Sequence, residues 1–224
     1  MAYPIDNLLN PVIRFFIVLL ILMVFSACSF KNEIIPTDPA EMMQDIDKGL
    51  TIKESRKLAK QLYRKMLENT IDHKIPKASI ECTTGRILNI QEILEAETII
   101  ISTDAYCAWG KEGLTTDFPE AIEKYRQDFP ERSVKIICLL KRMPSDTANP
   151  KVLTDLLKEV SPHYENIFII NESEAKKLNL HANPTRLYVN QECVVTHMDM
   201  GVSLIEGKLY REIIENLPNP DINE

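Results

Sequence analysis

The chain has 224 residues, 45% of them apolar and 26% charged, and its 33 acidic and 26 basic side chains give a formal net charge of −7. Low-complexity disorder is excluded, because a chain this apolar can bury enough surface to offset the entropy lost on ordering. The acidic balance argues against a general nucleic-acid binder, since phosphate contacts require a basic face.

The N-terminus has the layout of a secretory signal. Arg14 precedes the apolar run 15–27, which as a helix would rise about 20 Å and would not cross a hydrocarbon core of roughly 30 Å. The run ends in Phe25-Ser26-Ala27-Cys28, which resembles a bacterial lipobox with phenylalanine where leucine is usual. We therefore expect residues 1–27 to be a lipoprotein signal peptide and Cys28 to be lipidated. An uncleaved anchor over 12–30 and a helix of a soluble secreted protein are the alternatives.

A polar, proline-containing tether over 28–50 and an N-terminal helical segment over 51–76 are expected next. Thr51 and Glu54 form a capping-box signature for the start of this helix. Its apolar stripe consists of Leu58, Leu62 and Met66. The stripe either packs on the main domain or binds a partner.

The remaining residues, 77–220, alternate between strand and helix patterns and form one globular domain. The expected strands are 79–82, 86–90, 98–102, 133–140, 166–170, 186–190 and 193–197. The expected helices begin at 118 and 150 and cover 173–178 and 203–217. Alternating strands and helices indicate parallel pairing, and a terminal hairpin adds an antiparallel edge. The sequence thus predicts an α/β fold with a mixed sheet and helices on both of its faces.

Several common chemistries lack their motifs. Gly110 and Gly113 do not form a phosphate-binding G-x-G-x-x-G, and no G-x-S-x-G nucleophile elbow is present. There is no C-x-x-C pair, and Cys193 and His197 on a strand would lie about 13 Å apart, too far for one metal ion. We therefore expect neither a metal site nor another cofactor.

Two motifs do suggest a function. Tyr106-Cys107-Ala108-Trp109-Gly110 follows the apolar strand 98–102, and Asn183-Pro184-Thr185 precedes the strand 186–190. Together they resemble the thioredoxin superfamily, especially the TlpA-like thiol-disulfide proteins tethered in bacterial envelopes. In that family an aromatic-Cys-x-x-Cys motif opens a helix after a central strand, and a cis-proline lies opposite it. The resemblance implies a thioredoxin-like fold over about 77–220. It implies a catalytic Cys107 and a substrate-binding set of Tyr106, Trp109, Asn183, Pro184 and Thr185.

The departures from the family pattern are informative. Gly110 stands where the resolving cysteine belongs, and Ile101 stands where thioredoxins often have a buried acid, six residues before the nucleophile. A helix N-terminus still favours the Cys107 thiolate, which can attack a disulfide. Release of the mixed disulfide must then come from the substrate's second thiol or from an external thiol. By this reasoning, Gly110→Cys should strengthen disulfide reduction.

The predicted function is therefore thiol-disulfide exchange, as capture or isomerisation, through a single cysteine. The expected partners are thiol- or disulfide-bearing envelope proteins or peptides, outside the cytoplasm, and the membrane reached through the N-terminal lipid. The alternative is a non-catalytic binding module that uses the groove formed by Trp109 and the Pro184 loop.

Four further residues carry smaller expectations. Cys138 lies within an apolar strand and should be a core residue, whereas Cys82 and Cys193 are expected on short strands. His181, three residues before Pro184, either approaches the Cys107 thiol or is an ordinary loop residue. Pairing among the cysteines does not follow from the sequence.

Overall fold

The structure is a computed structural model that describes residues 32–39, 51–94, 97–201 and 207–217. The chain divides into two units after Asn32, and the second unit, Glu33–Glu224, is described here by itself. The expected signal peptide, Cys28 and most of the tether lie outside the described residues, as does the beginning of the expected helix 203–217. Within the described ranges, no helix combines the length and apolarity needed to span a membrane.

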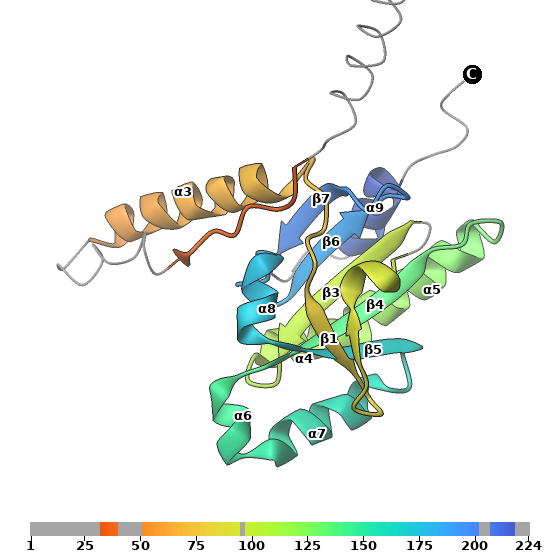
Figure 1. The fold of residues 1–224 in the computed structure, drawn as a ribbon. Helices are drawn as coiled ribbons and strands as arrows, with labels where there is room; N and C mark the ends of the chain where they lie inside the picture. The colour runs from red at the N-terminus through yellow and green to blue at the C-terminus, as the bar shows by residue number, and fades with distance from the viewer. Residues whose placement is uncertain (1–31, 40–50, 95–96, 202–206, 218–224) are drawn as a thin grey trace, which may run out of the picture. The chain divides into compact units, whose positions relative to one another are not determined.

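A mixed β-sheet forms the centre of this unit (Figure 1). Its strands in the described residues are β1 (Ser79–Cys82), β2 (Ile87–Asn89), β3 (Thr98–Asp104), β4 (Lys135–Arg142), β5 (Asn166–Asn171), β6 (Thr185–Val189) and β7 (Val195–Met200). They are arranged in the order β2-β1-β5-β4-β3-β6-β7. Strands β3, β4 and β5 pair in parallel, and β6 joins β3 antiparallel, with β7 beyond it. The predicted mixed sheet with an antiparallel terminal hairpin is confirmed.

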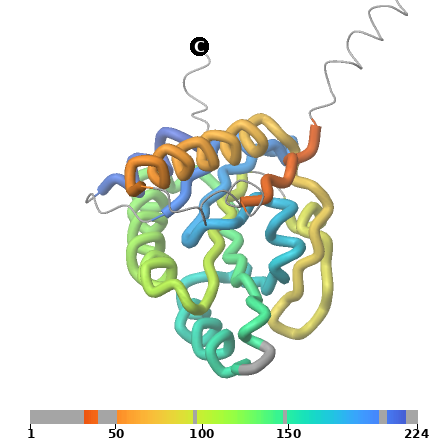
Figure 2. The backbone as a smooth tube through the Cα atoms, turned by 90° about the vertical axis from the view of Figure 1, so that its left-hand side faces the viewer, coloured from red at the N-terminus to blue at the C-terminus, as the bar shows by residue number. Residues whose placement is uncertain are grey.

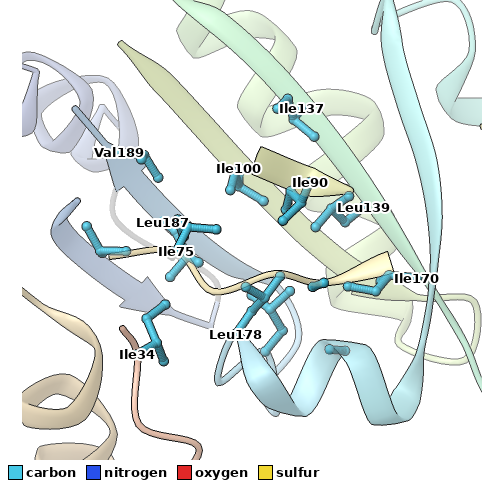
Figure 3. Close-up of a cluster of buried hydrophobic side chains, with 14 of the residues drawn as sticks. Ile34, Ile75, Ile90, Ile100, Ile137, Leu139, Ile170, Leu178, Leu187 and Val189 are labelled. Carbon is cyan, nitrogen blue, oxygen red and sulfur yellow. The ribbon is translucent and has the colours of Figure 1, made fainter. Parts of the chain in front are cut away.

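Helices pack on both faces of the sheet, as expected. The described helices are α3 (Ile52–Thr70), α4 (Ala108–Glu112), α5 (Phe118–Asp128), α6 (Pro144–Ala148), α7 (Pro150–Val160), α8 (Glu172–Lys177) and α9 (Lys208–Asn216). Helices α5, α7 and α9 bury their apolar sides in one core cluster. The other cluster joins the opposite sheet face to α8 and to the end of α3, and Figure 3 shows part of it. Helix α6, opened by Pro144, was not predicted.

Helix α3 begins where the sequence predicts it. The Glu54 amide donates to the Thr51 hydroxyl at 3.3 Å, and the Thr51 amide donates to the Glu54 carboxylate at 2.8 Å, which completes the capping box. Only Met66 and Thr70, near the C-terminal end, are buried. The apolar stripe therefore packs on the domain at that end, and Leu62 is only half-buried.

A short strap, residues 33–39, lies beside the C-terminal end of α3 (Figure 2). The Thr37 amide donates to the side-chain oxygen of Asn179 at 2.7 Å. The Asn179 side-chain amide donates to the Ile35 carbonyl at 3.0 Å and to the Thr70 hydroxyl at 2.8 Å. Asn179 is fully buried, so this one side chain joins the strap, α3 and the loop that leads to Pro184.

Candidate functional site

Cys107 is the N-cap residue of α4, directly after the loop that follows β3. Its Sγ accepts a hydrogen bond from the Gly110 amide at 3.3 Å, and its thiol donates to the Asn183 carbonyl oxygen at 3.8 Å. The side chain is half-buried. Helix α4 continues through a π-helical turn, Gly113–Asp117, into α5. A helix N-terminus favours negative charge, so this position stabilises a thiolate at Cys107.

The loop before β6 forms the opposite wall of the site. The peptide bond between Asn183 and Pro184 is cis, as the resemblance implied. Strand β6 runs antiparallel to β3, with Thr185 opposite Ser102, and this pairing carries the loop to the C-terminal end of β3. The sequence motifs 76 residues apart therefore meet in space, as predicted.

Thr185 does not have the position expected of a substrate-binding side chain. It is fully buried, and its hydroxyl donates to the Ala182 carbonyl at 2.8 Å. Because this hydrogen bond spans the cis-peptide loop, Thr185 supports the loop from within. The expectation that its side chain binds substrate is corrected accordingly.

Asp104, the last residue of β3, is a site residue that the sequence reasoning missed. One carboxylate oxygen accepts the Tyr106 amide at 2.9 Å and the Cys107 amide at 3.0 Å, and the other accepts the side-chain amide of Asn183. The carboxylate thus joins the cysteine loop to the cis-proline loop. The signal was present in the sequence, because an Asp side chain often accepts from the amides two and three residues on.

Lys141 is the buried cation beside this carboxylate. It lies opposite Asp104 in the parallel pair of β3 and β4 and is 4% exposed. Its ammonium donates to the carbonyls of Leu180 at 2.9 Å and Ala182 at 3.3 Å, both in the loop before Pro184. Burial lowers the pKa of Lys141 to about 8, against the raising effect of the negative charges of Asp104, Cys107 and Glu172.

The position of the absent resolving cysteine is filled by another side chain. A Cβ atom built on Gly110 would lie 1.9 Å from the Thr103 hydroxyl oxygen and 3.0 Å from the Thr103 Cβ. Real Cβ atoms do not approach another atom that closely, so glycine is the residue that fits beside Thr103. The single-thiol character of the site is therefore set by Thr103 together with Gly110.

Two aromatic rings lie on either side of Cys107 in the sequence and are open to solvent. Tyr106 is 51% exposed and Trp109 is 57% exposed. The sequence left open whether Trp109 contacts a client or packs on the Pro184 loop, and its large exposed area favours the first. Large exposed aromatic side chains are common anchors in protein interfaces.

The remaining cysteines lie in different surroundings, and all four in the described ranges are thiols. Cys138 is fully buried in β4, as expected for a core residue, and burial raises the pKa of its thiol far above the ordinary value. Cys82 ends β1, as expected. Cys193 was expected on a strand but lies in the turn between β6 and β7 with a φ of +60°. A strand residue cannot take that conformation.

His181 lies near the strap. Burial lowers its pKa, Lys141 and Lys176 lower it further, and Asp38 and the Thr37 backbone act in the opposite direction. The Sγ of Cys107 has its hydrogen bonds with Gly110 and Asn183 instead. His181 is thus a loop residue, the second of the two predicted alternatives. In the described part of the chain, no cluster of His, Cys, Asp or Glu side chains is arranged to hold a metal ion.

Fold and site together define a thioredoxin-like protein with one cysteine at the N-terminus of its active-site helix. No family model matches the sequence, and no curated protein matches it. Solved structures do match. A thioredoxin-like protein from Bacteroides caccae is 13% identical with a TM-score of 0.50, over 78% of this chain and 57% of that one.

Two other solved structures give similar values. A thioredoxin-like protein from Porphyromonas gingivalis is 15% identical with a TM-score of 0.48, over 62% of this chain and 86% of that one. The thioredoxin domain of a thiol-disulfide oxidoreductase from Bacteroides vulgatus is 13% identical with a TM-score of 0.47, over 63% of this chain and 94% of that one. At these identities the likeness establishes the fold alone, and the predicted thioredoxin-like fold is confirmed.

Proposed function

We propose that this protein carries out thiol-disulfide exchange, as capture or isomerisation, through the single thiol of Cys107. The observation that supports this most directly is the environment of its sulfur. The sulfur is half-buried, accepts the Gly110 amide at 3.3 Å and faces the carbonyl of the cis-proline loop. A thiolate held in this way is a competent nucleophile toward a disulfide.

The proposed reaction proceeds in two exchanges. The Cys107 thiolate attacks one sulfur of a substrate disulfide, forms a mixed disulfide and releases the other substrate sulfur as a thiolate. That thiolate, or another in the same substrate, then attacks the substrate sulfur of the mixed disulfide and regenerates Cys107. The two exchanges rearrange disulfides without net oxidation or reduction. When an external thiol resolves the mixed disulfide instead, that thiol supplies the reducing equivalents.

The site is proposed to act outside the cytoplasm on envelope proteins or peptides. Support comes from the sequence, in which a short apolar run ends at Cys28 in a lipobox-like pattern. Lipidation of Cys28 would anchor the domain to a membrane, with the residues up to 50 as a tether. The exposed Tyr106 and Trp109 would then contact the polypeptide that carries the disulfide.

Isomerisation of a scrambled-disulfide protein, followed by recovery of that protein's activity, tests the proposal. We expect the wild type to accelerate recovery in a redox buffer, and Cys107→Ser to abolish the acceleration. Cys82→Ser is the matched control, since this cysteine is also half-buried but lies in the β1–β2 hairpin. A Cys107→Ser variant that accelerates recovery as well as the wild type would refute the proposal.

The second candidate is a binding module that uses the same groove without chemistry. The observation that favours it is the exposure of Tyr106 and Trp109 beside a site with no resolving thiol. In that case Trp109→Ala would abolish capture of a client peptide, whereas Cys107→Ser would leave it intact. The proposed exchange reaction requires the opposite dependence on Cys107.

A further inference from the structure

A pair of buried opposite charges lies at the C-terminal ends of the two central strands. Asp104 on β3 and Lys141 on β4 are register partners, and they are 8% and 4% exposed. The position six residues before Cys107, where the thioredoxin pattern often has a buried acid, is the apolar Ile101. It pairs with Cys138 and lies in the core cluster on the other face of the sheet. The charges in this protein therefore lie three residues further along both strands, next to the cysteine loop.

Lys141 contacts the cis-proline loop directly. An ammonium has three N–H donors, and the carbonyls of Leu180 and Ala182 accept two of them at 2.9 Å and 3.3 Å. Ala182 is adjacent to Asn183, whose carbonyl faces the sulfur of Cys107. A lysine is rarely buried to this extent without a specific role for its charge.

Asp104 connects this cation to the cysteine. Its carboxylate accepts the backbone amides of Tyr106 and Cys107 and the side-chain amide of Asn183, so much of its charge is already engaged by hydrogen bonds. A single carboxylate that is spread over three donors leaves the neighbouring ammonium incompletely neutralised. The second negative charge that the pair can accommodate is the thiolate of Cys107.

We propose that Lys141 is the positioning residue of the thiol site: its buried ammonium holds the loop before Pro184 against Cys107 and stabilises the cysteine as thiolate. This inference rests on the proposed exchange function and assigns the stabilising charge within it. Ionisation releases the thiol proton to solvent, and Lys141 remains protonated throughout. It supplies a fixed positive charge where the thioredoxin pattern has a buried acid.

Several charged groups surround Lys141 and enter the argument. Asp104 on β3, Glu172 on α8 and the Cys107 thiolate favour its protonated form, whereas burial opposes it. His181 interacts with the same ammonium. By linkage, a thiolate that favours the ammonium is itself favoured by the ammonium to the same degree. The effect of Lys141 on Cys107 must therefore weaken once the lysine loses its proton, above about pH 8.

Alkylation of the full-length protein by iodoacetamide, measured by mass spectrometry of the peptide that contains Cys107, tests this proposal. Lys141→Met should slow alkylation at pH 7 about tenfold, the effect of losing one opposite charge at close range. Lys141→Arg, which keeps a charge, should restore most of the rate. At pH 10 all variants should react at similar rates, because the thiol is ionised in each.

The pH profile separates this charge effect from a structural one. A variant in which the loop merely collapses over Cys107 would react slowly at pH 7 and pH 10 alike, and that result would overturn the proposal. Lys111→Met is the matched control. Its ammonium is also close in sequence to Cys107, but it is 43% exposed and pairs with Glu159 at the surface. We expect less than about a twofold change there, because solvent screens exposed charges.

Asp104→Asn provides an independent variant if Lys141→Met does not fold, as judged by circular dichroism. The asparagine oxygen still accepts the two backbone amides, but the negative charge that competes for Lys141 is gone. Alkylation of Cys107 at pH 7 should then be severalfold faster than in the wild type. An unchanged or slower rate contradicts the proposal. Alkylation requires no disulfide substrate, so a normal response here with no isomerisation would refute the proposed function alone.

Discussion

Restoring a second thiol to the site should require two substitutions. Gly110→Cys places a thiol at the usual position for resolving a mixed disulfide, and from the sequence alone it was expected to strengthen disulfide reduction. In the structure its Cβ would lie 1.9 Å from the hydroxyl oxygen of Thr103 and 3.3 Å from the sulfur of Cys107. Thr103 is fully buried at the end of β3, so it has little room to move.

The size of the effect follows from this contact. Overpacking of a well-packed interior costs about 1–3 kcal/mol, so Gly110→Cys alone should lower the free energy of unfolding by about that amount. The double variant Thr103→Ala with Gly110→Cys removes the contact at 1.9 Å and leaves the one at 3.0 Å, which a shift of a few tenths of an ångström relieves. We expect it to recover part of the stability and to show stronger dithiol activity.

Urea unfolding and insulin reduction in dithiothreitol provide the two measurements. Gly110→Ala separates the steric cost from the chemistry, since it adds the same Cβ without a thiol. Gly113→Ala is the matched control, because its added Cβ would meet Pro184 at an ordinary 3.8 Å and its backbone is helical. It should be neutral or slightly stabilising. If Gly110→Cys alone is as stable as the wild type and turns over insulin strongly, the reasoning from Thr103 is wrong.

Three other predictions concern separate parts of the chain. Radiolabelled palmitate should enter the wild type and not Cys28→Ala, and an unmodified Cys28 on a full-length chain would refute the lipid anchor. Asn179→Ala should lower the free energy of unfolding by about 1–3 kcal/mol, because it leaves buried partners in the strap and α3 without hydrogen bonds. Because burial lowers the pKa of Lys141 to about 8, the unfolded chain binds more protons than the folded one from pH 8 to 10.5. The free energy of unfolding of the wild type relative to Lys141→Met should therefore rise across that window by about 1–3 kcal/mol, measured by urea unfolding at each pH.

The sequence predicted the architecture well because most of its elements are locally encoded. The apolar strand at 98–102 and the capping box at Thr51 depend on nearby residues, and both lie where they were expected. Strand β3 continues for two further residues, Thr103 and Asp104. These polar residues do not extend the apolar pattern, but both become buried because β4 pairs with them throughout.

The parts of the site that were missed arise from contacts between distant segments. The role of Asp104 depends on the side chain of Asn183, 79 residues away, and Lys141 donates to carbonyls about 40 residues further on. A lysine at the end of an apolar strand is indistinguishable in sequence from one that marks the start of a solvated loop. Its burial follows only from the way the loop before Pro184 folds over it.

The pairing of Thr103 with Gly110 also bears on which of the two candidate functions is favoured. A site that had simply lost its second cysteine would leave room for a thiol, but here a buried threonine occupies that space. The features that act on Cys107 itself are nevertheless complete: the Gly110 amide, the Asp104 cap and the cis-proline loop. Binding of a client requires none of these, whereas a reactive single thiol uses each of them. The arrangement therefore favours exchange through Cys107 over passive binding, and Cys107→Ser is the variant that separates them.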